Sequence, residues 1–531
     1  MRRGKVTSDQ KRFSLKEKSW IMYDWADSVY ATNIMAAIFP ILFSKVAKEA
    51  GAAGDQLLSY GVSAATLVVA LLAPVLGAIA DFKGMKKKLF TGFWLGGVVF
   101  TAMIALTNDY RVMLIGYVLS RIGYSGSSLF YDSFLTDVTT NDRMDKVSAW
   151  GYAMGYIGGS TIPFVLSIAL LVMTDYSAFA QKFSILITSA WWLVFTIPFL
   201  KNVHQEHYIE RNSQFSLDGV FRSVANTAAA IVSQKGLMLF MIAYFFYIDG
   251  VGTIINISTA YGSTLGLGGT GMILALLVTQ IVAMPCSILF GHLARRVTAR
   301  RALLLAIAVY MLICFVGFIM GFTLEPHQKR YDTAFKAYKA DAVAAVKETY
   351  AFEDVEALDD ELQRYMAEAK TAVLDGDTAG LALDAAAFSG ADAALAQDAS
   401  ETLAQATAAF SASSAQAAAS YQGAISRSTV LFWAMAVLVG TVQGGIQAVS
   451  RSFFGKLIPK ERSNEYFGFF DIFGKFASVV GPFLYGTMRG ITGRSSYGTL
   501  VLLLLFVMGF VVLLRAKKPL EELETSNNPA A

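Results

Sequence analysis

Residues 77–88 read GAIADFKGMKKK, and residues 291–301 read GHLARRVTARR. In each stretch a glycine is followed by a turn of small apolar residues and then by a cluster of basic side chains. The acidic residue Asp81 of the first stretch is replaced by Arg295 in the second. Two copies of one pattern, each at the end of a long apolar run, predict a chain built from two similar halves.

The sequence around these stretches is too apolar for a soluble domain. Hydrophobic residues make up 55% of the 531 residues and charged residues 16%, with a mean hydropathy of +0.49. Runs of roughly 18 or more apolar residues predict transmembrane helices, because about 20 residues at a rise of 1.5 Å cross the hydrocarbon layer. We therefore predict an all-α membrane protein with two six-helix halves. Its about twelve spans fall at 20–44, 58–80, 89–107, 112–136, 148–173, 182–200, 237–260, 270–291, 302–323, 429–451, 466–488 and 497–515.

Polar segments divide the chain further. We expect tails at 1–19 and 516–531, a first half at 20–200, a central linker at 201–236 and a second half at 237–515. Lys and Arg collect in both tails and in the loops after the second and eighth spans, and short loops rich in these residues stay in the cytoplasm. With twelve spans these four segments share one side, so both termini are predicted to be cytoplasmic. The compact tails favour the cytoplasmic membrane of a bacterium.

A long insert at 325–427 interrupts the second half between the ninth and tenth spans. It is rich in Ala and carries 17 acidic and 8 basic residues, a net charge of −9. Its place after the ninth span predicts an extracytoplasmic position. We expect a helical arm or hairpin at 331–375, and either helix or disorder at 385–425. The insert is either a cap that faces a partner or a solute, or a tolerated loop expansion, since long loops cost little entropy.

Three charged side chains fall near the middle of predicted spans, namely Arg121, Asp249 and Lys475. A charge inside the bilayer is costly unless it faces a cavity or a partner. Arg121 and Lys475 suit a solute carboxylate, which Arg can bind through two hydrogen bonds, and Asp249 suits an ammonium group or a proton. Alternatively, the three pair with one another across helices. Three midspan amides are expected to line a cavity or to bridge helices: Asn256, Gln443 and Gln447.

Other charges lie near the ends of spans. Asp24 and Asp27 are three residues apart and share one face of the first span. They are candidate gating residues that would pair with a basic side chain of another helix, and a hydrated helix end is the alternative. Asp132 and Asp137 are expected to be structural, and Arg451 is expected to reach the interface or to form an ion pair.

The sequence lacks the patterns that are typical of several other functions. The chain has no phosphate-binding loop of the GxxxxGK[ST] type, and its two cysteines, Cys286 and Cys314, lie inside predicted spans without metal-ligand spacing. No nucleophile and base cluster near an interface, as a membrane enzyme would need. We therefore expect no enzyme activity, no cofactor, no metal and no nucleic-acid partner, and we expect a monomer in the lipid bilayer.

The stretch at 77–88 resembles the loop signature G-x-x-x-D-x-x-G-x-[KR]-[KR] of the major facilitator superfamily. The matching residues are Asp81, Gly84, Lys86 and Lys87. In that superfamily the loop holds one conformation by contacting the eleventh helix of the other half. These four residues are therefore gating candidates, whereas Arg295 puts the equivalent contact of the second copy in doubt.

A closer resemblance is to the vacuole effluxer family of autophagy-related permeases and their bacterial relatives. It rests on YDWADS at 23–28, YIDGVGTI at 247–254 and VQGGIQAVSRS at 442–452, with Asp27 in place of the usual Asn. It covers most of the chain except the insert. The resemblance implies a secondary transporter that moves small solutes, with amino acids as the best-attested class, by efflux or with protons. The alternative is a membrane receptor or scaffold that uses the acidic insert.

Overall fold

The computed structural model describes residues 12–174, 177–210 and 217–527. These residues are almost entirely helical, and their one β-type contact is an isolated bridge between Phe82 and Ile209. Two of the helical spans contain a π-helical segment, labelled η1 and η2. The first half comprises α2 (Leu15–Val29), η1 (Tyr30–Ala37), α3 (Ile38–Glu49), α4 (Gly54–Ala80), α5 (Met85–Ala105), α6 (Tyr110–Ser133), α7 (Leu135–Val138), α8 (Met144–Gly155), η2 (Tyr156–Thr161), α9 (Ile162–Met173) and α10 (Ala178–Asn202).

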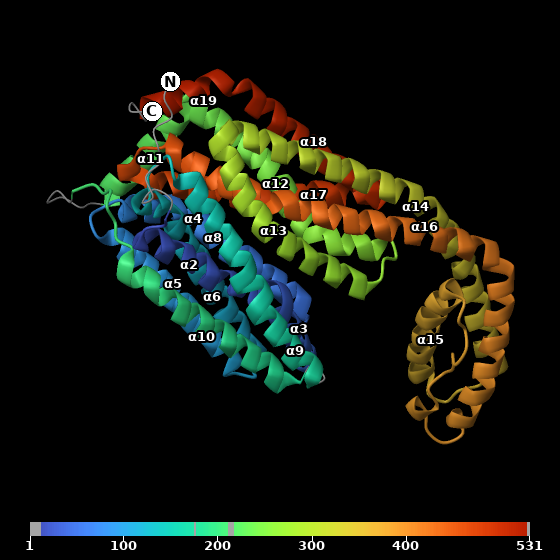
Figure 1. Ribbon diagram of the computed structural model, residues 1–531. Helices are drawn as coiled ribbons and strands as arrows, with labels where there is room; N and C mark the ends of the chain where they lie inside the picture. The colour runs from blue at the N-terminus through green and yellow to red at the C-terminus, as the bar shows by residue number, and fades with distance from the viewer. Residues whose placement is uncertain (1–11, 175–176, 211–216, 528–531) are drawn as a thin grey trace.

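The second half packs alongside the first. In Figure 1 the first half runs from blue to teal and the second half from green to red. One helix, α11, precedes it and one, α19, follows its last span. Its elements and these two flanking helices are α11 (Leu217–Ser233), α12 (Lys235–Thr264), α13 (Gly269–Val297), α14 (Ala299–Thr349), α15 (Val355–Asp375), η3 (Ala385–Ala387), α16 (Asp392–Leu457), η4 (Lys460–Arg462), α17 (Ser463–Thr492), α18 (Ser495–Arg515) and α19 (Lys517–Asn527).

Eleven helical segments of the described residues are long and apolar enough to cross a membrane. The helix α6 is the twelfth member of the bundle, with 24 residues, and it packs against α4, α5 and α17. It is less apolar because it contains Arg121 and a run of serines and tyrosines, and such a helix is tolerated where its polar face meets other helices. The predicted all-α membrane fold is thus confirmed, and the chain is a multi-pass integral membrane protein.

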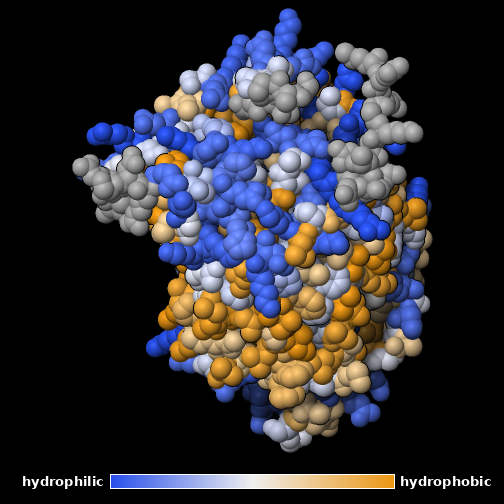
Figure 2. Space-filling model, turned by 60° about the vertical axis from the view of Figure 1, so that its left-hand side comes forward, coloured by the Kyte–Doolittle hydropathy of each residue, from blue (hydrophilic) through white to orange (hydrophobic). Residues whose placement is uncertain are grey.

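The outside of the bundle is apolar where lipid would touch it. Figure 2 shows a broad hydrophobic belt below a hydrophilic end. The belt includes large side chains that a soluble protein would bury, such as Leu71 at 66% exposed and Leu289 at 64% exposed. A contiguous apolar surface of this extent marks a lipid interface.

The insert is built from the transmembrane helices themselves. The helix α14 runs for 51 residues and α16 for 66, so neither ends at the membrane boundary that the apolar runs at 302–323 and 429–451 suggest. Their outer parts pack with α15 into a three-helix unit (Figure 1). Its core includes Tyr338 and Tyr365, whose hydroxyls lie 2.6 Å and 2.9 Å from Thr407 Oγ1. The Ala-rich stretch at 385–425 is therefore mostly helix, not disorder.

Two helices lie where the sequence predicted a polar linker and a tail. The linker contains α11, which buries Val220 and Ile231, and the tail contains α19, which buries Leu520. The helix α19 has 11 residues and is mostly polar, so apolar periodicity gave no signal for it. The 17 residues of α11 carry apolar side chains at 217, 220, 221, 224 and 231, a helical spacing that the prediction of a polar linker overlooked.

Candidate functional site

The two faces of the bundle differ. We call the face where α2 begins and α19 lies the terminal face, and the opposite end, from which α14 and α16 extend, the insert face (Figure 1). The helices of the two halves converge at the terminal face and diverge toward the insert face in this view. The contacts that hold the terminal face closed involve several of the predicted gating residues.

Asp81 connects the first half to the start of α17. It is 1% exposed, and its Oδ1 accepts hydrogen bonds from the backbone N of Asn464 at 2.9 Å and from Asn464 Nδ2 at 2.7 Å. Its Oδ2 accepts from the backbone N of Glu465 at 3.1 Å. A carboxylate at a helix N-terminus satisfies free N–H groups and the helix dipole. Burial raises the pKa of Asp81 to about 7, although the bonds from Asn464 and the charge of Lys86 lower it.

Lys86 forms a second buried contact beside Asp81. Its Nζ lies 2.7 Å from Asp137 Oδ2 and donates to Ser463 Oγ at 3.2 Å, and both charged side chains are fully buried. Although burial raises the pKa of Asp137, Lys86 and His207 lower it overall. The ion pair therefore holds the start of α5 against α7, and the hydrogen bond to Ser463 holds it against α17.

Two further residues of the loop signature have different roles. Gly84 has a φ of +74°, which glycine adopts without strain, and its N–H donates to Gln205 Oε1 at 2.9 Å. Lys87 has no side-chain partner among the described residues, so its part in gating stays a prediction.

Gly77 of α4 lies in close contact with the start of α17. A Cβ there would lie 2.4 Å from the carbonyl oxygen of Asn464 and 2.9 Å from Cα of Glu465. We expect Gly77→Ala to push the two helices apart, because backbone atoms cannot yield as a flexible side chain can. Overpacking costs about 1–3 kcal/mol. The population of the closed arrangement should therefore fall roughly tenfold or more.

The measurement for Gly77→Ala is the alkylation rate of a cysteine buried in the closed face. Ser452→Cys serves, because Ser452 is fully buried and joins α16 to Asp145 of α8 through a 2.6 Å hydrogen bond. The background lacks the two native cysteines. Gly92→Ala is the matched control, since a Cβ at Gly92 meets no atom within 4 Å. Equal labelling of both variants would contradict the prediction.

Arg451 forms the central bridge between the halves. This α16 side chain is 3% exposed. Its Nη1 lies 2.8 Å from Asp132 Oδ1 of α6, and its Nη2 lies 3.3 Å from Asp24 Oδ2 of α2. Its Nε donates to Ser148 Oγ of α8 at 3.0 Å. The guanidinium also lies over three aromatic rings, those of Trp20, Tyr131 and Tyr152.

The predicted gating pair on α2 is thus only partly joined to this bridge. Asp24 pairs with Arg451 and accepts a 2.6 Å hydrogen bond from the Tyr131 hydroxyl. Asp27 is also buried, at 5% exposed, but it forms no ion pair among the described residues. A gating role for Asp27 therefore stays a prediction.

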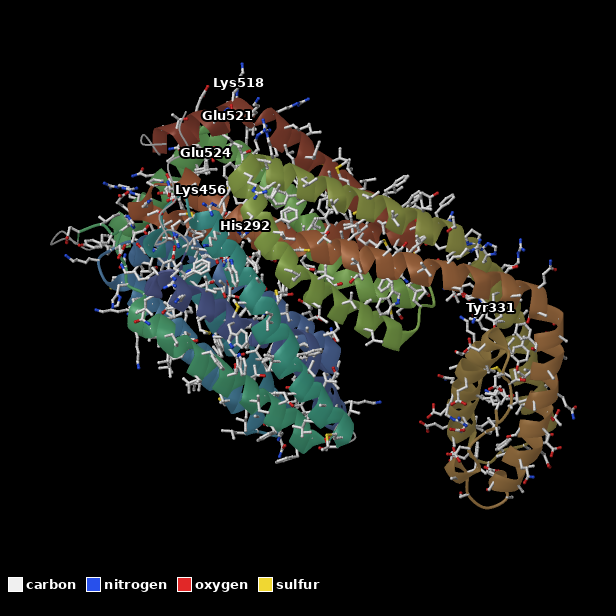
Figure 3. All side chains as sticks on the ribbon, viewed as in Figure 1. His292, Tyr331, Lys456, Lys518, Glu521 and Glu524 are labelled. Atoms are coloured by element: carbon white, nitrogen blue, oxygen red, sulfur yellow. The ribbon has the colours of Figure 1, made fainter. Side chains whose placement is uncertain are left out.

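A third bridge lies nearer the chain ends. Lys456 of α16 lies 2.5 Å from Asp145 Oδ2 of α8. Figure 3 shows Lys456 near Glu524 of α19. Burial raises the pKa of Glu524, while the charge of Lys456 lowers it. The tail helix therefore packs over the closed contact of the two halves.

A polar cavity of about 200 Å³ lies directly beside the Arg451 bridge, between the two halves. The first half contributes side chains from α6 and α8, and the second half contributes side chains from α12, α16 and α17. Lys475 and Asp471 of α17 form an ion pair one turn apart. The polar residues that line the cavity are Asp132, Tyr152, Tyr244, Gln447, Arg451, Asp471 and Lys475.

The structure does not bring the three predicted midspan charges together. Lys475 lines the polar cavity, but Arg121 does not, and its Nη1 donates to the Tyr117 hydroxyl at 3.1 Å. Asp249 is fully buried between α12 and α17, where its Oδ1 accepts from the N–H of Gly481 at 2.8 Å. The three side chains therefore do not line one cavity, and no ion pair joins them among the described residues. A solute or proton role for each of them stays a prediction.

The three predicted amides also separate. Gln447 lines the polar cavity. Gln443, one turn away on α16, lines a different, mostly apolar cavity of about 120 Å³ inside the second half. Asn256 of α12 is exposed and lines neither cavity.

Of the seven polar residues that line the polar cavity, sequence reasoning assigned only Gln447 and Lys475 to a site. Asp132 and Arg451 were assigned structural or interfacial roles because they lie near span ends. Asp471 was missed, although an acid four residues before Lys475 inside an apolar run is a signal for an ion pair on one helix face. Tyr152 and Tyr244 were missed because a tyrosine in a transmembrane helix is usually interpreted as an interface residue.

A twelve-helix bundle with two halves, a polar cavity between them and one closed face defines a membrane transporter of the major facilitator fold. The chain belongs to the family described as vacuole effluxer Atg22 like, whose model matches residues 55–332 and 426–519. The gap between these ranges falls in the insert.

Individual relatives agree with this assignment. The chain is 36% identical over 514 residues to the uncharacterized MFS-type transporter YxiO of Bacillus subtilis (strain 168), with 95% of each chain covered. It is 19% identical to autophagy-related protein 22 of Eremothecium gossypii, covering 94% of this chain and 89% of that protein.

Solved structures share the fold. A bacterial homologue of the iron transporter ferroportin, in an outward-facing state, matches with a TM-score of 0.54 at 13% identity, over 95% of this chain and 98% of that chain. The proton:xylose symporter XylE matches with a TM-score of 0.54 at 10% identity, over 94% of each chain. These structures share the fold, and the family model together with the 36% identical relative makes the protein a membrane transporter and not an enzyme.

Proposed function

We propose that this transporter is a secondary active carrier of small zwitterionic solutes, with amino acids as the substrate class, and that the polar cavity holds the solute. The observation that carries the proposal is the pairing of opposite charges in that cavity. Lys475 and Arg451 are suited to a carboxylate, and Asp471 and Asp132 are suited to an ammonium group. The cavity of about 200 Å³ exceeds the roughly 10–15 Å³ that one water molecule needs.

The same charges connect solute binding to the closed face. Asp132 and Arg451 line the cavity and also form the bridge from α6 and α2 to α16. A solute carboxylate that binds Arg451, or an ammonium group that binds Asp132, competes with this bridge. Binding would therefore weaken the closed terminal face and favour the arrangement open on that side, as alternating access requires.

We further propose that the terminal face is cytoplasmic and that the host membrane is the cytoplasmic membrane of a bacterium. Basic residues lie at that face after α4 and after α13, in keeping with the positive-inside rule. The acidic insert then lies outside the cell.

The test of the proposed function is uptake of labelled alanine, leucine and phenylalanine into proteoliposomes, with and without a pH gradient. We expect Lys475→Gln and Asp471→Asn each to raise KM about tenfold or more, because each removes a charge that pairs with the zwitterion. Lys48→Gln, at an exposed position at the end of α3, is the matched control and should leave KM unchanged. No uptake of any amino acid by folded protein would favour another solute or the receptor interpretation.

A further inference from the structure

A second polar site lies between α12 and α17, apart from the solute cavity. Asp249 and Thr253 are one turn apart on α12, and both are fully buried. Asp249 Oδ1 accepts the hydrogen bond from Gly481 of α17. The other carboxyl oxygen, Oδ2, and the hydroxyl oxygen of Thr253 are buried within reach of each other, and neither has a further hydrogen-bond partner among the described residues. A buried carboxyl that faces one hydroxyl and no cation is costly in its charged form, so this pair needs an explanation.

No cation lies against Asp249 among the described residues. On α17, the charged residues Asp471 and Lys475 pair with each other in the solute cavity. On α18, the side facing α12 presents the ring of Phe506, which a Cβ at Gly250 would meet at 2.6 Å. These elements leave Asp249 without a counter-charge.

The helix α12 also packs against α11, α13, α16 and α19, and no ion pair joins Asp249 to any of them among the described residues. On the α16 side, the hydroxyl of Tyr247 lies 2.7 Å from Ser450 Oγ. A carboxylate in this environment would be strongly disfavoured, whereas a protonated carboxyl can donate to the Thr253 hydroxyl.

The helix α17 packs closely against the site. A Cβ at Gly481 would lie 2.0 Å from Thr253 Oγ1 and 2.7 Å from Asp249 Oδ1, and Asp249 lines neither the solute cavity nor the apolar cavity. A proton needs no added volume. The geometry therefore favours a proton over a sodium ion as the occupant.

We propose that Asp249 and Thr253 form a proton-carrying site, distinct from the solute cavity, that couples transport to a proton gradient. This proposal rests on the proposed transport function and adds its coupling ion. In the packed arrangement the carboxyl holds the proton on Oδ2, and this O–H donates a hydrogen bond to the Thr253 hydroxyl oxygen. When α17 moves away from α12, water reaches Asp249 and the proton passes to water, leaving the carboxylate.

A break in the backbone hydrogen bonding of α17 lies next to the site and permits this movement. Pro482 follows Gly481 inside α17, and proline provides no N–H for the helical hydrogen bond. The N–H of Gly481 in turn donates to Asp249. The helix is therefore least constrained at the level of the carboxyl, where a bend would expose it.

The first test measures the proton without any solute. Infrared difference spectra of the purified full-length protein between acidic and alkaline pH should show the carbonyl stretch of a protonated carboxyl that disappears in Asp249→Asn. Thr253→Val should shift this band, because it removes the hydrogen-bond partner. Asp471→Asn is the control and should keep the band. A band that persists in Asp249→Asn, or that the wild type lacks, would overturn the proposal.

The second test separates proton coupling from solute binding. In proteoliposomes, Asp249→Asn should reduce pH-gradient-driven accumulation of amino acid about tenfold or more. Exchange of labelled for unlabelled amino acid should fall much less, because exchange moves no net proton. Asp249→Glu should retain part of the accumulation. An infrared band with no amino-acid uptake would refute the substrate class and keep the proton site, whereas equal loss of exchange and accumulation would overturn the separation of the two sites.

Discussion

Replacing Arg451 by Leu is expected to abolish transport and to lower the Tm of the protein. The substitution removes the cation from Asp24 and Asp132, and it leaves both carboxyls without their partner beside a buried cluster of rings. Removing one partner of a buried ion pair costs about 3–5 kcal/mol. The Tm in detergent should therefore fall by roughly 5 °C, and uptake in proteoliposomes should fall below detection.

Two controls separate the charge of Arg451 from its shape. Arg451→Lys keeps the charge but cannot reach Asp24, Asp132 and Ser148 together, so it should retain stability better than Arg451→Leu and transport only weakly. The triple variant Asp24→Asn, Asp132→Asn, Arg451→Met removes every charge of the bridge. It should recover much of the lost Tm without recovering transport. Normal transport by Arg451→Leu would refute a role for this bridge in the transport cycle.

The terminal-face contact of Asp81 is the part of the site that the sequence predicted best. The loop signature placed an acid after the second span, and the structure places it on the N-terminus of α17. The prediction for Asp81 succeeded because the contact depends on a local pattern, in which a glycine allows close approach and an acid follows one turn later. The partner helix came from the family resemblance, and no feature of the stretch itself identified α17.

The polar cavity was harder to predict because depth in the membrane fixes only one of three coordinates. Lys475 and Gly481 are six residues apart on α17, a rotation of about 240° at 3.6 residues per turn. Lys475 therefore faces the cavity, whereas Gly481 faces Asp249 on α12. Residues at similar depth on neighbouring helices can thus belong to different sites. Only the packing of the helices shows which faces meet.

The insert shows a different limit of sequence reasoning. Alanine and serine at 385–425 are compatible with helix or disorder, and composition does not decide between them. The decision comes from tertiary contacts of large side chains on α14 and α15 with α16, such as the stacking of Tyr338 on Phe410 with ring centroids 4.6 Å apart. Helical stability in proteins comes mostly from such packing.

The Asp81→Ala variant is expected to open the terminal face. Loss of the Asp81 carboxylate leaves three buried N–H groups at the start of α17 without an acceptor. Each unsatisfied group costs about 1–3 kcal/mol. In the arrangement open on this side these donors can bind water, so the substitution penalises the closed arrangement. Alkylation of the Ser452→Cys reporter should accelerate about tenfold or more. Asp81→Asn keeps an acceptor for Asn464 and should have a smaller effect.

The pH dependence of the same reporter tests the charge on Asp81. Burial raises its pKa to about 7 in the closed arrangement, whereas an exposed aspartate has a pKa of about 3.9. The closed arrangement therefore binds the proton more tightly, so falling pH favours closure between these two values. Because alkylation consumes the thiolate, whose fraction falls on acidification in every protein, the quantity to compare is the labelling rate of the otherwise native protein divided by that of Asp81→Ala. Acidification from about pH 8 to about pH 6 should lower this ratio. A ratio that rises or stays constant would show that Asp81 does not control the closed face through its charge.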